Sequence, residues 1–590
     1  MVLSQAGARR RVLSLVATVA VLSGCAVAGA TPDQPAGVDS RTLEDPGVPA
    51  TAPIPDRPNV VFILTDDLSS NLVPHMAEVT ALARDGVSFD NFIVSDPQCC
   101  PSRATILTGK YPHNTEVESN DWPTGGFGMF TKHNEEASLG PYLQAAGYRT
   151  GLMGKYLNGY EPEGRVATKP KLAPPYIEGY VPPGWDEWHV PGRQGYRHFG
   201  YSMATAVDEP VATVEQFGDV EEDYLTDVLA TRAEEFIDRA APGVDGSDAQ
   251  PFFLEISTFA PHSGGRKLPV PGESAVSIAP RDQALAPRDA ADWPRQWADP
   301  TFPGGDCGDP DGGGCAQITY PEPTDEHGRL SFGVVPEDAP DWQTGRGLDE
   351  GLDRMRARYV ERVQMVQSLD DLVGRVRAKL VEAGLDDTTY LVFSSDNGFH
   401  IGEHGLKSGK TTAYDHDVRV PLIILPPTGT PGTPGRTVDV LAQNNDLTPT
   451  FLELADHDLP RPVDGTSLVP LLHGADPPDT WRQAAFIEFT KKSYGRAAKA
   501  AQVSASYHAI RTESYLYVNY ADGGAPPTAG EAEFYDLRAD PGQIDNLFAE
   551  LSEADQATLA AATARYAECR GEECADAGAS APSVTLPGST

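Results

Sequence analysis

Four short apolar segments constrain the fold of this chain more than any other feature of its sequence. The run at 60–64, VVFIL, is continuously apolar and mostly β-branched, which is the pattern of a strand buried on both faces, as in a parallel sheet. The segments 148–156, 251–262 and 389–398 share this character. Helical patterns alternate with them, most clearly at 350–384. Strands that alternate with helices predict an α/β sandwich around a large, mostly parallel sheet.

Each of these four strands ends in polar residues. The ends carry two acid-containing pairs, a lysine and a histidine: Asp66 and Asp67, Lys155, His262, and Asp396 and Asn397. In open α/β sheets, ligand sites form beyond the carboxyl ends of the strands. A single Asp pair at such a place is often a turn or a helix cap. Four polar ends together predict a functional site.

The acidic and amide side chains at these ends offer oxygen ligands only, and such sites select calcium or magnesium over zinc. The chain has a formal net charge of -39, which argues against nucleic acid or an anionic membrane surface as a partner. An anionic substrate would need a locally basic site. Four residues near the motifs can supply it: Arg103, Lys155, His262 and Lys410.

The N-terminus has the pattern of an export signal. Three arginines precede a short apolar run that ends in LSGC, which resembles a bacterial lipoprotein box with Cys25 as the lipidated residue; a plain secretory signal is the alternative. A Pro- and Ala-rich stretch follows, as in a flexible tether. We expect a signal peptide with lipobox at 1–25, a flexible linker at 26–56, a catalytic domain at 57–430 with an irregular lid- or wall-like insertion at 264–350, the rest of the sheet and a smaller C-terminal α+β subdomain at 431–570, and a disordered tail at 571–590.

Cysteine is used sparingly, with seven in the chain. Two pairs could close small rings in an oxidising compartment: Cys307 with Cys315, and Cys569 with Cys574. Cys99 and Cys100 are adjacent and so are poorly placed to bridge each other. Pro101 favours a helix start, which puts Cys99 at a helix N-terminus with Arg103 one turn later. A thiolate nucleophile is conceivable there, but a soft thiolate does not suit a hard cation, and the chemistry calls for an oxygen nucleophile.

The stretch CCPSR followed by TGK, residues 99–103 and 108–110, resembles the signature of type I sulfatases. The resemblance extends over about 57–550 and includes TDD, GKY, APH, SDNG and SGKTTAYDHDVRVPLII. GKYPHN and GKYLNGY most resemble N-acetylglucosamine-6-sulfatases and extracellular heparan 6-sulfatases. The resemblance to this family implies an alkaline-phosphatase-like fold and hydrolysis of a sulfate ester, such as that of 6-O-sulfated N-acetylglucosamine.

The family resemblance also implies roles for the site residues. Cys99 would be converted by a formylglycine-generating enzyme to formylglycine (3-oxoalanine), whose hydrate attacks sulfur. One Ca²⁺ per chain would be held by Asp66, Asp67, Cys99, Asp396 and Asn397. Arg103 would stabilise the hydrate, Lys155 and Lys410 would bind sulfate oxygens, and His262 would bind sulfate or protonate the leaving alcohol. The membrane would be met only through a lipid anchor, and the protein would be a cell-surface lipoprotein or secreted.

One position departs from the pattern of many sulfatases, which have histidine where this chain has Leu157. The base for the elimination step is therefore open. His113 is our first candidate, with His404 and His400 behind it. Two other functions stay open: a phosphonate or phosphate monoester hydrolase of the same superfamily, and a non-catalytic sugar-binding lipoprotein.

Overall fold

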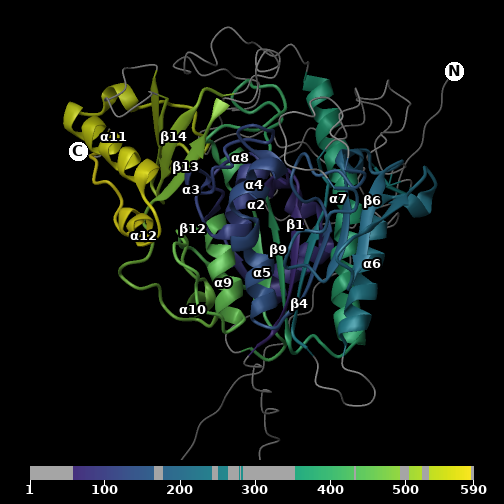
Figure 1. Ribbon diagram of the computed structural model, residues 1–590. Coiled ribbons are helices and arrows are strands. Elements are labelled where there is room, and N and C mark those ends of the chain that lie inside the picture. Colours follow the sequence, from purple (N-terminus) through teal and green to yellow (C-terminus); the bar gives the residue numbers. More distant parts are fainter. Residues whose placement is uncertain are drawn as a thin grey trace, which may run out of the picture. The chain divides into compact units, whose positions relative to one another are not determined.

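A ten-stranded sheet is the framework of the computed structural model (Figure 1). The structure describes residues 57–164, 177–241, 250–262, 278–279, 281–282, 352–430, 434–491, 504–520 and 531–586, with 352–357 as backbone only. In spatial order the strands are β11 (Arg436–Val438), β2 (Val87–Phe89), β10 (Leu422–Leu425), β9 (Thr389–Ser395), β1 (Asn59–Thr65), β8 (Phe252–Ser257), β4 (Arg149–Gly154), β5 (Glu187–Pro191), β6 (Ser202–Val207) and β7 (Thr213–Gln216).

The four strands expected from the sequence lie together in the middle of this sheet. β9, β1, β8, β4 and β5 are parallel neighbours, and every residue of β1, β8 and β9 is buried. The outer strands β10, β6 and β7 pair antiparallel. The α/β fold class with a mostly parallel central sheet is confirmed, and the continuous apolar runs reflect burial on both faces.

Helices cover both faces of the sheet. On one face lie α1 (Ala77–Asp85), α6 (Leu225–Ala240) and the long α7 (Leu352–Glu382), which packs its apolar stripe against the sheet (Figure 1). On the other lie α2 (Cys99–Thr108), α4 (Gly126–His133), α5 (Leu139–Ala145) and α9 (Leu447–Leu454). β1 serves both cores, because alternate side chains of a strand point to opposite faces.

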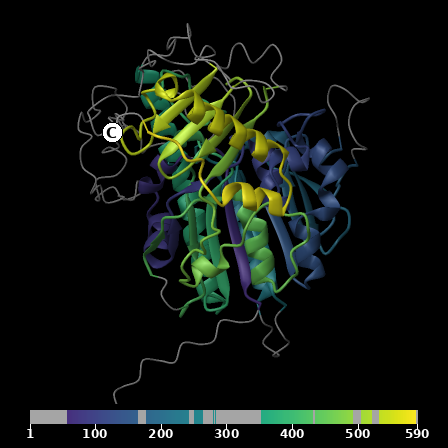
Figure 2. The same ribbon diagram turned by 90° about the vertical axis from the view of Figure 1, so that its left-hand side faces the viewer.

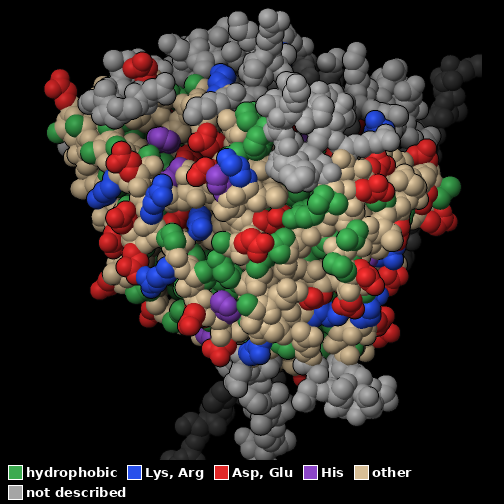
Figure 3. All heavy atoms as spheres, viewed as in Figure 1, with side chains coloured by type: hydrophobic (Ala, Val, Ile, Leu, Met, Phe, Trp, Pro, Cys, Tyr) green, Lys and Arg blue, Asp and Glu red, His purple; other side chains and the backbone are tan. Residues whose placement is uncertain are grey.

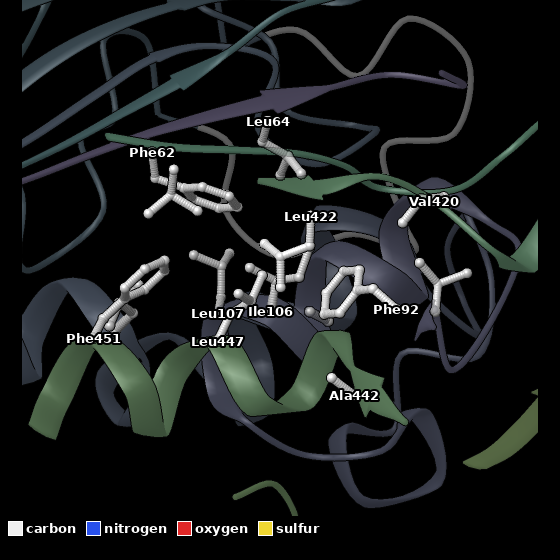
Figure 4. Close-up of a cluster of buried hydrophobic side chains, with 14 of the residues drawn as sticks. Phe62, Leu64, Phe92, Ile106, Leu107, Val420, Leu422, Ala442, Leu447 and Phe451 are labelled. Carbon is white, nitrogen blue, oxygen red and sulfur yellow. The ribbon is translucent and has the colours of Figure 1, made fainter. Parts of the chain in front are cut away.

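The core on the α2 side is shown in close-up in Figure 4. Phe62 and Leu64 of β1 point toward Leu107 of α2 and toward α9, and the Phe62 and Phe451 ring centroids are 5.3 Å apart. Leu107 is only 4% exposed, and Phe62 is fully buried. This packing fixes α2 against the sheet, so the position of its N-terminal residue Cys99 follows from the core beneath it.

A second, smaller sheet forms the C-terminal part. Its antiparallel strands are β13 (Ala485–Phe489), β14 (Tyr507–Arg511), β15 (Tyr515–Asn519) and β16 (Ala532–Asp536). The helices α11 (Glu553–Glu568) and α12 (Glu572–Gly578) belong to the same segment, which is yellow in Figure 2. Phe486 and Ile510 of the sheet share an apolar cluster with Leu559 and Tyr566 of α11. The expected α+β C-terminal subdomain is confirmed.

The disordered tail expected from 571 onward is wrong for the helix α12. The disulfide between Cys569 and Cys574 ties the start of this segment to the end of α11, and Cys574 and Ala577 are buried. The small ring that the sequence allowed for Cys569 and Cys574 is therefore present. The short polar stretch between them gives no periodic signal, so the sequence pattern missed the helix.

The remaining elements are short. They are β3 (Phe92–Ile93) paired with β12 (Ala442–Gln443), α3 (Pro112–Thr115), α8 (Asp415–Val418), α10 (Val469–Leu472), and the 3-10 turns Ser70–His75, Glu135–Ala137, Arg193–Arg197, Glu221–Asp223, Asn444–Asp446 and Phe548–Glu550. Within the described ranges, no helix is both long and apolar enough to span a bilayer. The signal, Cys25, the linker, the Cys307–Cys315 ring and nearly all of the 264–350 insertion lie outside the described residues.

Candidate active site

The four polar strand ends meet at one edge of the sheet because the strands that carry them are parallel. Thr65 of β1 pairs with Ser395 of β9, and Leu64 pairs with Ser257 of β8. Gly154 of β4 also pairs with Ser257. The residues that follow these positions therefore emerge side by side, as expected for a ligand site at the carboxyl ends of a parallel sheet.

Three carboxylates and one thiol come together there. One ligand atom from each of Asp66, Asp67, Cys99 and Asp396 lies within 4.8 Å of the others, and all four residues are buried. Cys99 Sγ lies 3.5 Å from Asp66 Oδ1. Asn397 joins the group through its amide, which donates to Asp67 Oδ1 at 2.7 Å. The structure thus brings together all five residues of the expected metal site.

Two lysines hold positive charge in this cluster. Lys410 Nζ contacts Asp67 Oδ1, Cys99 Sγ at 2.8 Å and Asn397 Oδ1 at 3.0 Å. Lys155 Nζ lies 2.6 Å from Asp66 Oδ2 and 3.5 Å from Asp396 Oδ2. Acidic and basic side chains are interspersed on the face seen in Figure 3, and in this buried cluster the two lysines are paired directly with the carboxylates.

Arg103, one turn after Cys99 in α2, forms hydrogen bonds with residues at three strand ends. Its guanidinium donates to Asp396 Oδ2 at 2.8 Å, to Lys155 O at 3.0 Å and to Ser257 Oγ. Arg103 is 2% exposed. Burial lowers the pKa of Arg103, but the negative charges of Asp396 and Asp66 raise it to a net value above its ordinary range. The arginine is therefore a fixed cation that fastens α2 to three strands.

Burial and charge pairing set the protonation of the acids. Burial raises the pKa of Asp67, but Lys410 and His262 lower it by more, so the carboxyl ionises well below its usual range. Burial also raises the pKa of Asp396, and Arg103 with the two lysines brings the net value below normal. For Asp66 burial dominates over Lys155, and its pKa is raised. Burial, assisted by Asp66, raises the pKa of the Cys99 thiol.

His262 lies at the open side of the cluster. Its Nε2 is 3.6 Å from Asp67 Oδ2, and the side chain is 30% exposed. The backbone behind it is held by Arg362 of α7, which donates to Pro261 O at 3.2 Å and to Asp67 O. Sequence analysis did not single out Arg362, because a lone arginine in the apolar stripe of a long helix carries no motif.

Cys100 has a structural position beside the site. Its Sγ accepts a hydrogen bond of 3.2 Å from the backbone N–H of Asn158, and its own backbone N–H donates to Asn120 Oδ1 at 2.8 Å. Cys100 is fully buried and free. It joins the start of α2 to the loop that follows Lys155.

The three candidate bases lie in other surroundings. His113 Nδ1 is 2.7 Å from Glu488 Oε1 and its Nε2 is 3.1 Å from Cys569 O, so both ring nitrogens bond the C-terminal part. His400 Nδ1 pairs with Asp417 at 2.9 Å, behind the loop that carries Lys410. His404 stacks on Tyr414, 3.9 Å between centroids. Leu157 is 3% exposed within the apolar core, so it gives no substitute for the histidine.

A buried carboxylate cluster with flanking cations, set beyond the carboxyl ends of a parallel α/β sheet, is suited to hold a divalent cation beside an anionic group. The model of the sulfatase family matches residues 58–457, and that of the N-sulphoglucosamine sulphohydrolase C-terminal region matches 402–565. The chain belongs to the sulfatase family, whose members are sulfuric ester hydrolases.

Named relatives agree with this assignment. A Caenorhabditis elegans homologue of the extracellular sulfatase Sulf-1 is 31% identical over 70% of this chain and 49% of its own length. The human N-acetylglucosamine-6-sulfatase is 27% identical over 83% of this chain and 81% of its own length. The chain thus spans about half of the first relative and most of the second.

Solved structures share the fold. One is a protein in complex with its substrate D-glucosamine-2-N,6-O-disulfate, with a TM-score of 0.56 and 23% identity over 85% of this chain and 94% of that one. Another is the phosphonate monoester hydrolase of Agrobacterium radiobacter, with a TM-score of 0.53 and 24% identity over 86% of this chain and 94% of that one. At these identities the likeness concerns the fold.

Proposed function

We propose that this protein hydrolyses the sulfate ester of a sulfated sugar, with a formylglycine made from Cys99 and a bound calcium ion. The observation that carries the proposal is the convergence of Cys99, three carboxylates and two lysines within one buried cluster. A cysteine in this setting suits a precursor better than a mature nucleophile, because a thiol is a soft ligand for a hard cation.

The donor set fits calcium. Asp66, Asp67 and Asp396 supply carboxylate oxygens and Asn397 an amide oxygen, which are the ligands that calcium prefers. The Lys410 ammonium already touches Asp67 and Asn397, so these oxygens are arranged to surround a positive charge. Formylglycine at 99 would replace the thiol by oxygen. The ion, when bound, would withdraw electrons from the sulfate group as a Lewis acid.

The charge of the cluster suits an anionic group. With Asp66, Asp67 and Asp396 ionised, their three negative charges balance the three positive charges of Arg103, Lys155 and Lys410. A divalent cation would make the site net positive. Long-range repulsion by the acidic chain would then be offset where the sulfate binds.

The protein's own residues divide the remaining work. Lys155 and Lys410 bind sulfate oxygens and stabilise the charge that grows on them. His262 lies at the accessible side of the cluster, where it donates a proton to the departing sugar oxygen. Arg103 holds the strand ends and the start of α2 in register, so that the group at 99 faces the sulfur.

The sugar substrate is inferred from the relatives. One is named N-acetylglucosamine-6-sulfatase, and one fold neighbour was solved with a glucosamine disulfate. We therefore propose 6-O-sulfated N-acetylglucosamine, alone or in a glycosaminoglycan, as the substrate. Export rests on the N-terminal signal pattern and on relatives named extracellular sulfatases. Lipid attachment at Cys25 stays a prediction from the sequence.

The test is turnover by protein produced together with a formylglycine-generating enzyme. We expect release of sulfate from an aryl sulfate and from 6-O-sulfated N-acetylglucosamine. We expect little hydrolysis of an aryl phosphonate ester. Preferred turnover of the phosphonate would favour the phosphonate or phosphate ester hydrolase. Binding of the sulfated sugar without any turnover would favour the non-catalytic sugar-binding alternative.

A further inference from the structure

Tyr196 reaches the site from a connection that no motif marks. It lies in the 3-10 turn Arg193–Arg197 between β5 and β6. Because β5 runs parallel to β4, the connection leaves β5 at the same edge of the sheet at which β4 delivers Lys155. Tyr196 is half-buried, and Gly195 beside it packs so closely on Phe259 that an added Cβ would lie 2.7 Å from that ring.

The Tyr196 ring contacts two of the three substrate-facing groups of the proposed mechanism, Lys155 and His262. Lys155 Nζ is 5.3 Å from the ring centroid, within the range of a cation–π contact. The His262 ring lies 4.6 Å away at an angle of 53°, and Phe259 meets the tyrosine edge-on at 4.9 Å. One aromatic ring therefore limits where both the ammonium and the imidazole can move.

The hydroxyl fixes the ring in turn. The Tyr196 hydroxyl donates a 3.0 Å hydrogen bond to Asn158 Oδ1. The backbone N–H of Asn158 donates to Cys100 Sγ at 3.2 Å. The Asn158 carbonyl accepts from Phe127 N–H at 2.9 Å. Through Asn158, the ring is anchored to the loop after β4 and to the start of α2. These contacts give Cys100 a structural role that does not involve the reaction of the sulfate ester.

We infer that Tyr196 is a positioning residue, whose ring face holds Lys155 and His262 in place for the sulfate, with its hydroxyl as a secondary anchor of that ring. The expected effect on the rate of turnover rests on the proposed function. The expected effect on the positions of Lys155 and His262 does not. Positioning errors of about 1 Å can cost on the order of 100-fold in rate.

The experiment compares Tyr196→Leu with Tyr196→Phe, and uses Tyr142→Leu as a matched control, since Tyr142 is half-buried and packs on His457. In crystal structures we expect Lys155 Nζ and the His262 ring to shift by about 1 Å or more in Tyr196→Leu and to stay in place in Tyr196→Phe. We expect kcat on an aryl sulfate to fall ~10- to 100-fold for Tyr196→Leu and by at most a few-fold for the other two.

The outcomes separate the two proposals. If the wild type turns over no sulfate ester, the proposed function fails, while the displacement still decides the role of Tyr196. Unmoved Lys155 and His262 in Tyr196→Leu overturn the inference, whatever the rate. A Tyr196→Phe variant as slow as Tyr196→Leu also overturns it, because the ring face would then not be what positions the two groups. If Tyr196→Leu does not fold, Tyr196→Met, which also removes the aromatic ring, is measured by the same two readouts.

Discussion

The guanidinium of Arg103 donates a 2.8 Å hydrogen bond to the carboxylate of Asp396, although 293 positions separate the two residues. Both side chains are buried, with 3% and 0% exposure. The pair joins the helix that starts at Cys99 to the strand end that carries two of the proposed calcium ligands. The first prediction follows from this relationship.

Replacement of Arg103 by alanine should lower the free energy of unfolding by about 3–5 kcal/mol, because it leaves Asp396 buried without its partner. Arg103→Lys should recover only part of this loss, since one ammonium cannot bond Asp396, Ser257 and Lys155 O at once. Urea denaturation monitors the effect. Unchanged stability together with lost turnover would contradict this account and would leave Arg103 a role at residue 99 alone.

Calcium should stabilise the protein through the carboxylate cluster. A ligand that binds only the folded state adds about 2.7 kcal/mol at a concentration 100 times its Kd, so chelation should lower the Tm of the wild type. Asp396→Asn should abolish this dependence, whereas Asp458→Asn, a change at an exposed aspartate, should retain it. Differential scanning calorimetry with and without chelator makes the comparison. Equal calcium dependence in both variants would show that the cluster holds no ion.

His113 should act through stability rather than chemistry. Burial alone would lower its pKa, but the ion pair with Glu488 raises it to about 9 from the ordinary 6.5. The folded state therefore holds the proton more tightly than the unfolded state. The resulting stabilisation, about 3 kcal/mol at most, is present in full below pH 6.5 and is lost as the pH rises toward 9.

The variant His113→Asn should remove this pH dependence between pH 6.5 and 9. Its turnover at a pH and temperature where it is folded should remain close to that of the wild type. Denaturation curves at several pH values measure the first effect, and His457→Asn is the control. A folded His113→Asn variant without turnover would restore His113 as the base that the sequence analysis favoured.

Cys100 should contribute modestly to stability and little to conversion of Cys99. Cys100→Ala leaves the half-buried backbone N–H of Asn158 without its acceptor, which costs at most about 1–3 kcal/mol. Thermal unfolding and the formylglycine content of the variant can be measured on the same sample. Failure of conversion in Cys100→Ala would mean that the maturation enzyme reads the second cysteine, and that the contact with Asn158 is incidental.

The site was predictable from the sequence as far as it follows from strand polarity. Asp66, Lys155, His262 and Asp396 each follow an apolar run, and parallel strands bring such residues to one edge. The signature around Cys99 added the role of the cysteine by resemblance, and the segment that begins SGKTTAYD added the role of Lys410. The side chains that hold these groups were not predictable, because they contact the site only through the tertiary fold.

Tyr196 and Arg362 show why. Tyr196 reaches Lys155 across a β5–β6 connection, and Arg362 reaches Asp67 O from a helix nearly 300 positions later. Neither residue belongs to a motif that marks it in the sequence. His113 failed in the opposite way. It lies 14 positions after Cys99 in the sequence, but α2 runs away from the site between them. The His113 ring therefore contacts Glu488 and Cys569 of the C-terminal part.

The most direct test of the central claim is the mass of the peptide that contains Cys99, taken from enzyme that hydrolyses sulfate esters. Conversion to formylglycine makes this peptide lighter by the mass of hydrogen sulfide less that of one oxygen atom. We predict that the converted fraction rises in proportion to specific activity and that Cys99→Ala has neither. A fully active preparation whose peptide carries an unmodified thiol would contradict the account.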